Sequence, residues 1–138
     1  KRKIARVIDA NLNRAREGLR VCEDICRFLY DLKGATQGYK KIRHQLTGVA
    51  KTLGVVEIVQ ARDSRRDVGR PTLAEETPRR GVNDIFYANS QRVKESIRVL
   101  EECAKILDLK VAEELKGLRY RVYQIEQEAV LKNKLKRR

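Results

Sequence analysis

The chain has 138 residues and a formal net charge of +13, from 32 Lys and Arg against 19 Asp and Glu. This length suffices for one domain with a real core, and the charge predicts attraction to anions: phosphorylated metabolites, nucleotides, nucleic acid or an anionic membrane surface. No apolar run reaches the roughly 18–20 residues of a membrane span and no signal-type segment is present, so we expect a cytoplasmic protein. Three cysteines and a single histidine argue against a disulfide framework, a zinc site and a histidine-dependent catalytic set.

Apolar spacing typical of amphipathic helices predicts four helices, over residues 4–32, 36–53, 84–107 and 111–131, followed by a basic tail over 132–138. Consecutive helices joined by short turns form hairpins. The predicted fold is therefore an all-α helical bundle of two duplicated hairpins with approximate internal two-fold symmetry. We expect a single domain, 1–138, with repeats over about 4–54 and 84–132, a connector over about 55–83, and the first and third helices facing each other.

Residues 10–29 reappear as residues 88–107 at a constant offset of 78, with eight of the twenty pairs identical. Chance would give about one identity, so an internal duplication is the better interpretation. Each copy carries an apolar stripe that we expect in the core, with its buried thiols acting as small hydrophobes. The stripes are Ile8, Ala15, Leu19, Cys22, Cys26 and Leu29, and Phe86, Val93, Ile97, Leu100, Ala104 and Leu107.

The duplication also kept polar residues, which packing alone does not require. The identical pairs are Asn11 and Asn89, Arg14 and Arg92, Glu17 and Glu95, Arg20 and Arg98, and Glu23 and Glu101. A solvated face with ion pairs of about 0.2–0.5 kcal/mol each explains these residues as well as a ligand site does. Both interpretations stay open at this point.

The connector concentrates charge in residues 61–72, where Arg62, Asp63, Asp67 and Gly69 lie. Arginine can clamp phosphate oxygens, aspartate can hold Mg²⁺, and glycine lets the backbone approach a ligand. A mobile charged linker is an equal alternative from composition. The β-prone residues 55–59 suit a short extended piece or the buried end of the second helix. Neither a GxxxxGK[ST] nor a GxGxxG motif occurs, which excludes P-loop and Rossmann nucleotide sites.

The segment IDANLNRAREGLRV over residues 8–21 closely resembles the opening signature of the alternative hydroxymethylpyrimidine phosphate kinase family of thiamine biosynthesis. The resemblance continues through ARD at 61–63, DVG at 67–69, AN at 88–89, RVLEE at 98–102 and LRYR at 118–121, so it covers nearly the whole chain. Such proteins occur alone or fused ahead of thiamine phosphate synthase, and are often named thiamine-phosphate pyrophosphorylase-like.

The resemblance implies phosphoryl transfer from ATP to hydroxymethylpyrimidine phosphate, with Mg²⁺, and thiamine phosphate synthase as a partner. We expect Arg20, Asp63 and Arg98 to be catalytic and Glu23 and Glu101 to bind Mg²⁺. The expected substrate-binding residues are Asn11, Arg14, Glu17, Arg62, Asp67, Gly69, Asn89, Arg92 and Glu95. One hypothesis gives each repeat face its own phosphorylated ligand.

Two other functions remain open from the sequence. The domain could bind a pathway intermediate as a noncatalytic or regulatory partner of thiamine phosphate synthase. It could also bind nucleic acid through basic residues at 40–41, 65–66 and 79–80 and through the tail, but aromatic residues for base stacking are few and no reader motif stands out. An exposed remainder of the apolar stripes would suit a homodimer.

Overall fold

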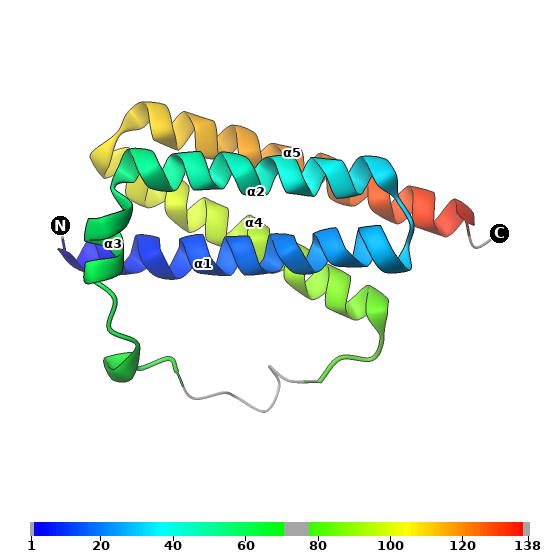
Figure 1. Cartoon of the computed structure of the whole chain (residues 1–138), viewed down its shortest axis with the longest axis horizontal. Coiled ribbons are helices and arrows are strands. Elements are labelled where there is room, and N and C mark those ends of the chain that lie inside the picture. Colours follow the sequence, from blue (N-terminus) through cyan, green and yellow to red (C-terminus); the bar gives the residue numbers. More distant parts are fainter. Residues whose placement is uncertain (1, 71–77, 137–138) are drawn as a thin grey trace.

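The computed structural model describes residues 2–70 and 78–136 (Figure 1). Within these residues there are five α-helices and no strand, which confirms the predicted all-α class. The helices are α1 (Arg2–Asp24), α2 (Lys33–Leu53), α3 (Val55–Gln60), α4 (Val82–Leu107) and α5 (Leu109–Lys136). Residue 1, connector residues 71–77 and tail residues 137–138, which the sequence prediction also covered, lie outside the described residues.

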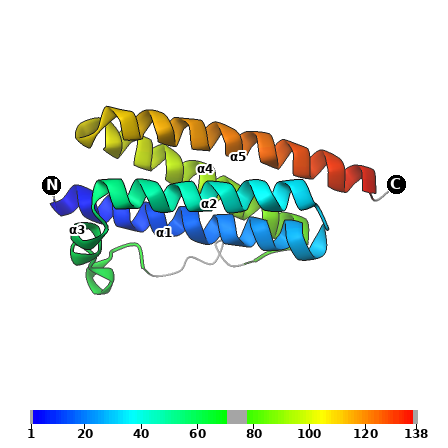
Figure 2. The same ribbon diagram turned by 45° about the horizontal axis from the view of Figure 1, so that its top comes forward.

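The four long helices form a bundle in which α1 packs on α2 and α4, and α5 packs on α2 and α4. Figures 1 and 2 show α2 beside α5, while α3 and residues 61–70 lie at the N-terminal end of α1. The face that α1 and α4 share is therefore opposite the face that α2 and α5 share. As expected, the first helix of each repeat contacts its counterpart, α1 against α4.

Helix boundaries differ from the predicted ones mainly where the backbone changes geometry. Gly54 ends α2 as predicted, with a left-handed φ of 92° that glycine adopts readily. The β-prone residues 55–59 belong to the short helix α3 rather than to an extended piece. Helix α5 runs through Lys136, so most of the predicted basic tail is helical.

The predicted apolar stripes are buried except at their last members. A π-helical turn over Ile25–Leu29 follows α1, and the wider π-turn shifts the register of the side chains that follow. Leu29 is therefore 59% exposed, and Tyr30 takes the buried position instead. Leu107 is exposed because α4 ends there and Asp108 is extended.

Helices α1 and α4 cross closely and run antiparallel, and Gly18 lies at their contact. A Cβ atom on Gly18 would meet Val93 Cγ2 at 2.7 Å and the carbonyl oxygen of Asn89 at 3.0 Å. Further along, the Cys22 thiol lies 3.8 Å from the carbonyl oxygen of Phe86. The small residue thus sets how near the two repeats approach.

Candidate functional site: a cleft beside the α1 and α4 crossing

Two adjoining hollows lie on the α1 side of the bundle. The larger one, here the connector cleft, has a volume of about 870 Å³ and lies between the N-terminal part of α1 and the connector. The smaller one, here the α1–α4 groove, has a volume of about 370 Å³. Asn11 and Arg14 line both hollows. The cleft is also lined by Lys3, Arg6, Val7, Asp9, Ala10, Asn13, Glu17, Arg62, Asp63, Ser64 and Asp67, and the groove by Ala88, Arg92, Glu95, Ser96 and Val99.

A bidentate ion pair joins the connector to α1. Arg62 Nε donates to Asp9 Oδ2 and Arg62 Nη2 donates to Asp9 Oδ1, each at 2.7 Å. Asp9 is only 6% exposed, and Asn13 Nδ2 also donates to its Oδ1 at 3.3 Å. The hydrogen bond to Asp9 raises the pKa of Arg62 above its ordinary value. A bidentate arginine and carboxylate fix orientation as well as distance, so this pair positions residues 62–67 over the cleft.

Four cationic side chains of the two hollows have no ion-pair partner among the residues that the structure describes. They are Lys3, Arg6, Arg14 and Arg92. Arg14 and Arg92 are equivalent positions of the duplication, yet they line one groove. Residues from both repeats therefore line one groove beside the α1–α4 crossing. This arrangement disfavours the hypothesis of one separate ligand face per repeat.

The carboxylates of the cleft differ in their hydrogen-bond and ion-pair partners. Asp63 Oδ1 accepts from the backbone N–H of Arg66 at 3.3 Å, and Asp67 Oδ1 accepts from Gly69 N–H at 2.8 Å, so both aspartates also shape the connector. Glu17 has no ion-pair partner among the described residues. Nowhere in the described ranges do three His, Cys, Asp or Glu side chains gather as a ready metal site.

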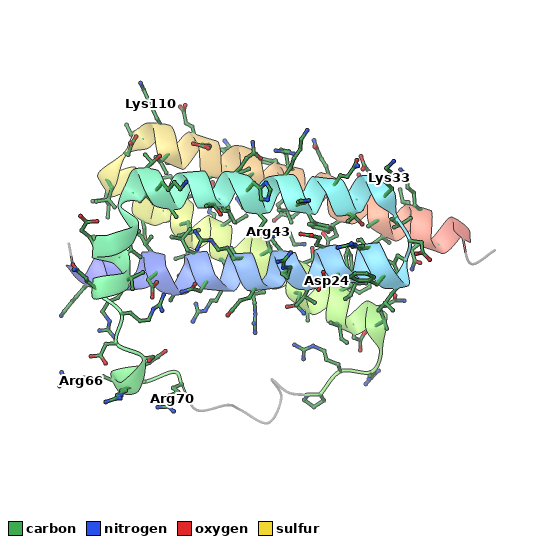
Figure 3. The ribbon with its side chains drawn as sticks, viewed as in Figure 1. Asp24, Lys33, Arg43, Arg66, Arg70 and Lys110 are labelled. Carbon is green, nitrogen blue, oxygen red and sulfur yellow. The ribbon has the colours of Figure 1, made fainter. Side chains whose placement is uncertain are left out.

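Glu23 and Glu101, predicted to bind Mg²⁺, have other partners. Glu23 Oε1 accepts from Arg43 Nε at 3.1 Å, and Glu101 accepts from Nε and Nη2 of Arg119. Figure 3 shows Arg43 between α2 and α1. These pairs join each first helix to the second helix of its own repeat. The hydrogen bond to Glu101 raises the pKa of Arg119.

The two glutamates are also far apart. Cys22, next to Glu23, lies against Phe86, and Phe86 precedes Glu101 by fifteen positions, or about 22 Å of helix. One metal ion cannot bridge carboxylates at that separation. The structure therefore favours an ion-pairing role for both residues.

The remaining predicted residues lie outside the lining of the cleft and the groove. Arg20 pairs with Glu23, and Arg98 pairs with Glu101 and Glu102, all by contacts of 3.5–3.9 Å on exposed arginines. Asn89 Nδ2 donates to the carbonyl oxygen of Ile85 at 2.9 Å, as Asn11 does to Val7 at 2.8 Å. The exposed Gly69 completes the connector turn. Arg66 and Arg70 point away from the helices at the outer edge of the connector (Figure 3).

Burial makes the thiols of α1 and the π-turn poor nucleophiles, because it raises the pKa of Cys22 strongly and that of Cys26 to about 12. We therefore assign them to the core, as predicted.

Residues that the sequence reasoning missed include Lys3, Arg6 and Asp9. They precede the repeated segment, and Asp9 aligns with Tyr87 in the second copy. These residues are not among the polar types kept in both copies, so the repeat did not select them. A charged residue such as Asp9 on the edge of an apolar stripe could have indicated a buried ion pair.

Among the described helices, none is both long enough and apolar enough to cross a membrane. No solved structure matches the chain significantly.

Curated relatives do match most of the chain. It is 43% identical over 124 residues to a thiamine-phosphate synthase of Synechocystis sp., covering 89% of this chain and 35% of the relative. It is 38% identical over 133 residues to a thiamine-phosphate synthase of Thermosynechococcus vestitus, covering 94% and 36%, and 33% identical over 132 residues to one of Rhodopirellula baltica, covering 95% and 35%. The chain thus spans about a third of the length of these relatives. The model of the ThiD2 family matches residues 6–128, which contain the groove, all of the cleft lining except Lys3 and most of both repeats, and the chain belongs to this family.

Proposed function

We propose that this domain acts in thiamine biosynthesis by transferring the γ-phosphoryl group of ATP to the phosphate of hydroxymethylpyrimidine phosphate. Family membership and the names of the relatives support the pathway. The observation that carries the reaction type is the convergence of Arg14 and Arg92, neither of them ion-paired within the described residues, on one groove beside a cleft. Two polyanionic reactants require this kind of charge neutralisation.

The proposed chemistry needs little covalent help from the protein. A phosphate oxygen of the pyrimidine substrate attacks the γ-phosphorus, the bond from that phosphorus to the β–γ bridging oxygen breaks, and its electron pair leaves with ADP. The attacking oxygen is already anionic, so no strong general base is required, in keeping with a chain that has one histidine. Arg14 and Arg92 would stabilise charge on the transferring group, while Arg6 and Lys3 would hold the outer phosphates.

Mg²⁺ fits this site as an ion shared with the substrate. In phosphoryl-transfer sites it is commonly held by one or two carboxylates together with substrate phosphates, and not by a cage of protein ligands. Glu17 and Asp67 line the cleft and supply hard oxygen ligands, so they would hold the ion in place of Glu23 and Glu101. When bound, the ion would neutralise phosphate charge.

The product would be hydroxymethylpyrimidine diphosphate, the substrate of thiamine phosphate synthase. The matched relatives carry that name and are about three times as long as the matched region. We propose that the domain supplies the diphosphate to such a synthase, either within one polypeptide or as a separate partner.

The test is to incubate the purified domain with Mg-ATP and hydroxymethylpyrimidine phosphate and to measure ADP and the diphosphate by chromatography. We expect Arg14→Ala and Arg92→Ala each to lower kcat/KM at least a hundredfold while the helical circular dichroism signal stays unchanged. Lys110→Ala removes one positive charge at the start of α5, where Figure 3 shows it pointing outward, and should leave the rate unchanged. Binding of the pyrimidine phosphate without any product would instead support the noncatalytic, regulatory function, and failure of both ligands to bind would refute both.

A further inference from the structure

A second hollow lies on the opposite face of the bundle, between α2 and α5. This α2–α5 groove has a volume of about 540 Å³. It is lined by Gly34, Gln37, Gly38, Lys40, Lys41, His44, Arg121, Gln124, Ile125 and Glu128. Because α1 and α4 form the other face, the core of the bundle separates this groove from the connector cleft. A ligand here would not take part in a transfer at the α1–α4 crossing.

The groove has two chemically different sections. Near the start of α2, the groove floor is the largely buried Ile125, which packs so closely on Gly38 that a Cβ there would meet Ile125 Cδ1 at 2.7 Å, whereas nothing lies within 4 Å of a Cβ on Gly34. Gln37, Gln124 and Glu128 place amide and carboxylate groups around this apolar floor. This section suits a flat ring that carries hydrogen-bond donors.

Further along α2, the groove becomes cationic. Lys40 and Lys41 are exposed and have no ion-pair partner among the described residues. Arg121 reaches across from α5, and its Nη1 donates to Gln45 Oε1. The neutral amide leaves the guanidinium charge uncompensated. This section suits a phosphate.

The duplication does not explain this grouping of charges. Arg43 and Arg119 are equivalent, which sets an offset of 76 between α2 and α5. At that offset, Gln37 and Gly38 correspond to Glu113 and Glu114, while Gly34 and Lys40 correspond to Lys110 and Lys116, so the equivalent end of the α2–α5 face carries charges of both signs. Lys41 corresponds to Gly117, so the adjacent lysines 40 and 41 occur at one end of this face alone.

We propose that the α2–α5 groove binds a nucleotide whose amino-substituted heteroaromatic base is joined through its sugar to a phosphate. The base lies on Ile125, with its amino group donating to Glu128 and its ring edge bonded to the glutamine amides. The phosphate lies between Lys41 and Arg121. About 15 Å of helix separates Gly34 from His44, which is enough for base and phosphate to bind side by side along the groove. This inference does not rest on the proposed kinase activity, because it concerns binding on another face.

The experiment is a titration of the ¹⁵N-labelled domain with AMP, which has no γ-phosphoryl group to transfer, followed by NMR. We expect saturable shifts of the Gly34 and Gly38 amide signals. Lys41→Glu should weaken this binding at least tenfold, whereas Arg14→Ala, in the connector cleft, should leave it unchanged. Lys110→Glu makes the same change of charge at the position equivalent to Gly34 and should have less than a twofold effect.

Three results would overturn the proposal. The first is AMP shifts confined to residues of the connector cleft. The second is equal weakening by Lys41→Glu and Lys110→Glu, which would show attraction to net charge alone. The third is binding of inorganic phosphate as tightly as AMP, which would show that the part of the groove around Ile125 contributes nothing to binding the base.

Discussion

The two repeats of the molecule contain equivalent ion pairs, but only the first repeat forms the connector cleft. In the first half Glu23 pairs with Arg43, and in the second Glu101 pairs with Arg119, at equivalent positions. Both glutamates are almost fully buried. Their retention in both copies is therefore explained by attachment of each first helix to its second helix. Polar residues that are identical in both repeats can therefore be structural ion-pairing residues as readily as ligand-binding residues.

The differences between the halves point to function more directly. Asp9 and Arg62 hold the connector against α1, while the position equivalent to Asp9 is the half-exposed Tyr87. Lys94 pairs with Glu126 at 2.9 Å in the second half, whereas its counterpart Arg16 has a buried Nε with no hydrogen-bond partner in the described part of the chain. The first half thus carries the connector cleft, and the second half adds Arg92 to the adjoining α1–α4 groove.

The largest predicted effect concerns the shared ion pairs. Arg119→Met leaves Glu101, 3% exposed, with only the 3.9 Å contact to the exposed Arg98, and we expect the free energy of unfolding to fall by about 3 kcal/mol, because a poorly compensated buried charge is costly. Arg43→Met should cost less, since the Arg43 side chain is 20% exposed against 11% for Arg119. Urea denaturation measures both. A larger loss for Arg43→Met would contradict the ranking.

The crossing of the two halves can be tested at Gly18. Gly18→Ala places a methyl group 2.7 Å from Val93 Cγ2 and 3.0 Å from a backbone oxygen, so α1 and α4 must move apart, and we expect a loss of about 2 kcal/mol. Gly48→Ala is the matched control within α2, because nothing lies within 4 Å of its added Cβ. That variant should gain up to about 1 kcal/mol from helix propensity. Equal unfolding midpoints for the two variants would rule out close packing at Gly18.

The asymmetric ion pair should affect activity more than stability. Asp9→Asn removes the charge that holds Arg62, and because the Arg62 side chain is about half exposed we expect at most about 1 kcal/mol of lost stability. We expect KM for the pyrimidine phosphate to rise at least tenfold, since residues 62–67 lose their fixed position. Tyr87→Phe, at the equivalent position, should change neither quantity. An unchanged KM in Asp9→Asn would show that the connector acts independently of α1.

The smallest effect concerns the cysteines. Burial raises the pKa values of Cys22, Cys26 and Cys103, the last being half-buried. At pH 8 we expect iodoacetamide to modify Cys103 first, as measured by mass spectrometry. Cys26 titrates at 9.0 when unfolded and at about 12 when folded, so the unfolded chain loses this proton first and stability falls as the pH rises from about 9 to 12. Cys26→Ala should show a shallower fall, and rapid modification of Cys26 at pH 8 would contradict its burial.

The all-α class, the duplication and most of the core followed from sequence because they depend on local, periodic patterns. Spacing of apolar residues at helical intervals identified buried positions from Ile8 to Cys26, and Gly54 marked the end of α2. The π-turn that exposes Leu29 breaks that period by one residue. A periodic pattern cannot anticipate this shift, because packing of Tyr30 into the core decides it.

The site was only partly determined by the sequence. The repeat and the connector motif selected Asn11, Arg14, Arg62 and Arg92, and the fold brings these residues to two adjoining hollows. It also pairs Glu23 and Glu101 with partly buried arginines from other helices. Whether a charged side chain is free for a ligand depends on partners many positions away in the chain. Helical periodicity fixes which way a residue faces, but only the packing of helices fixes what it meets.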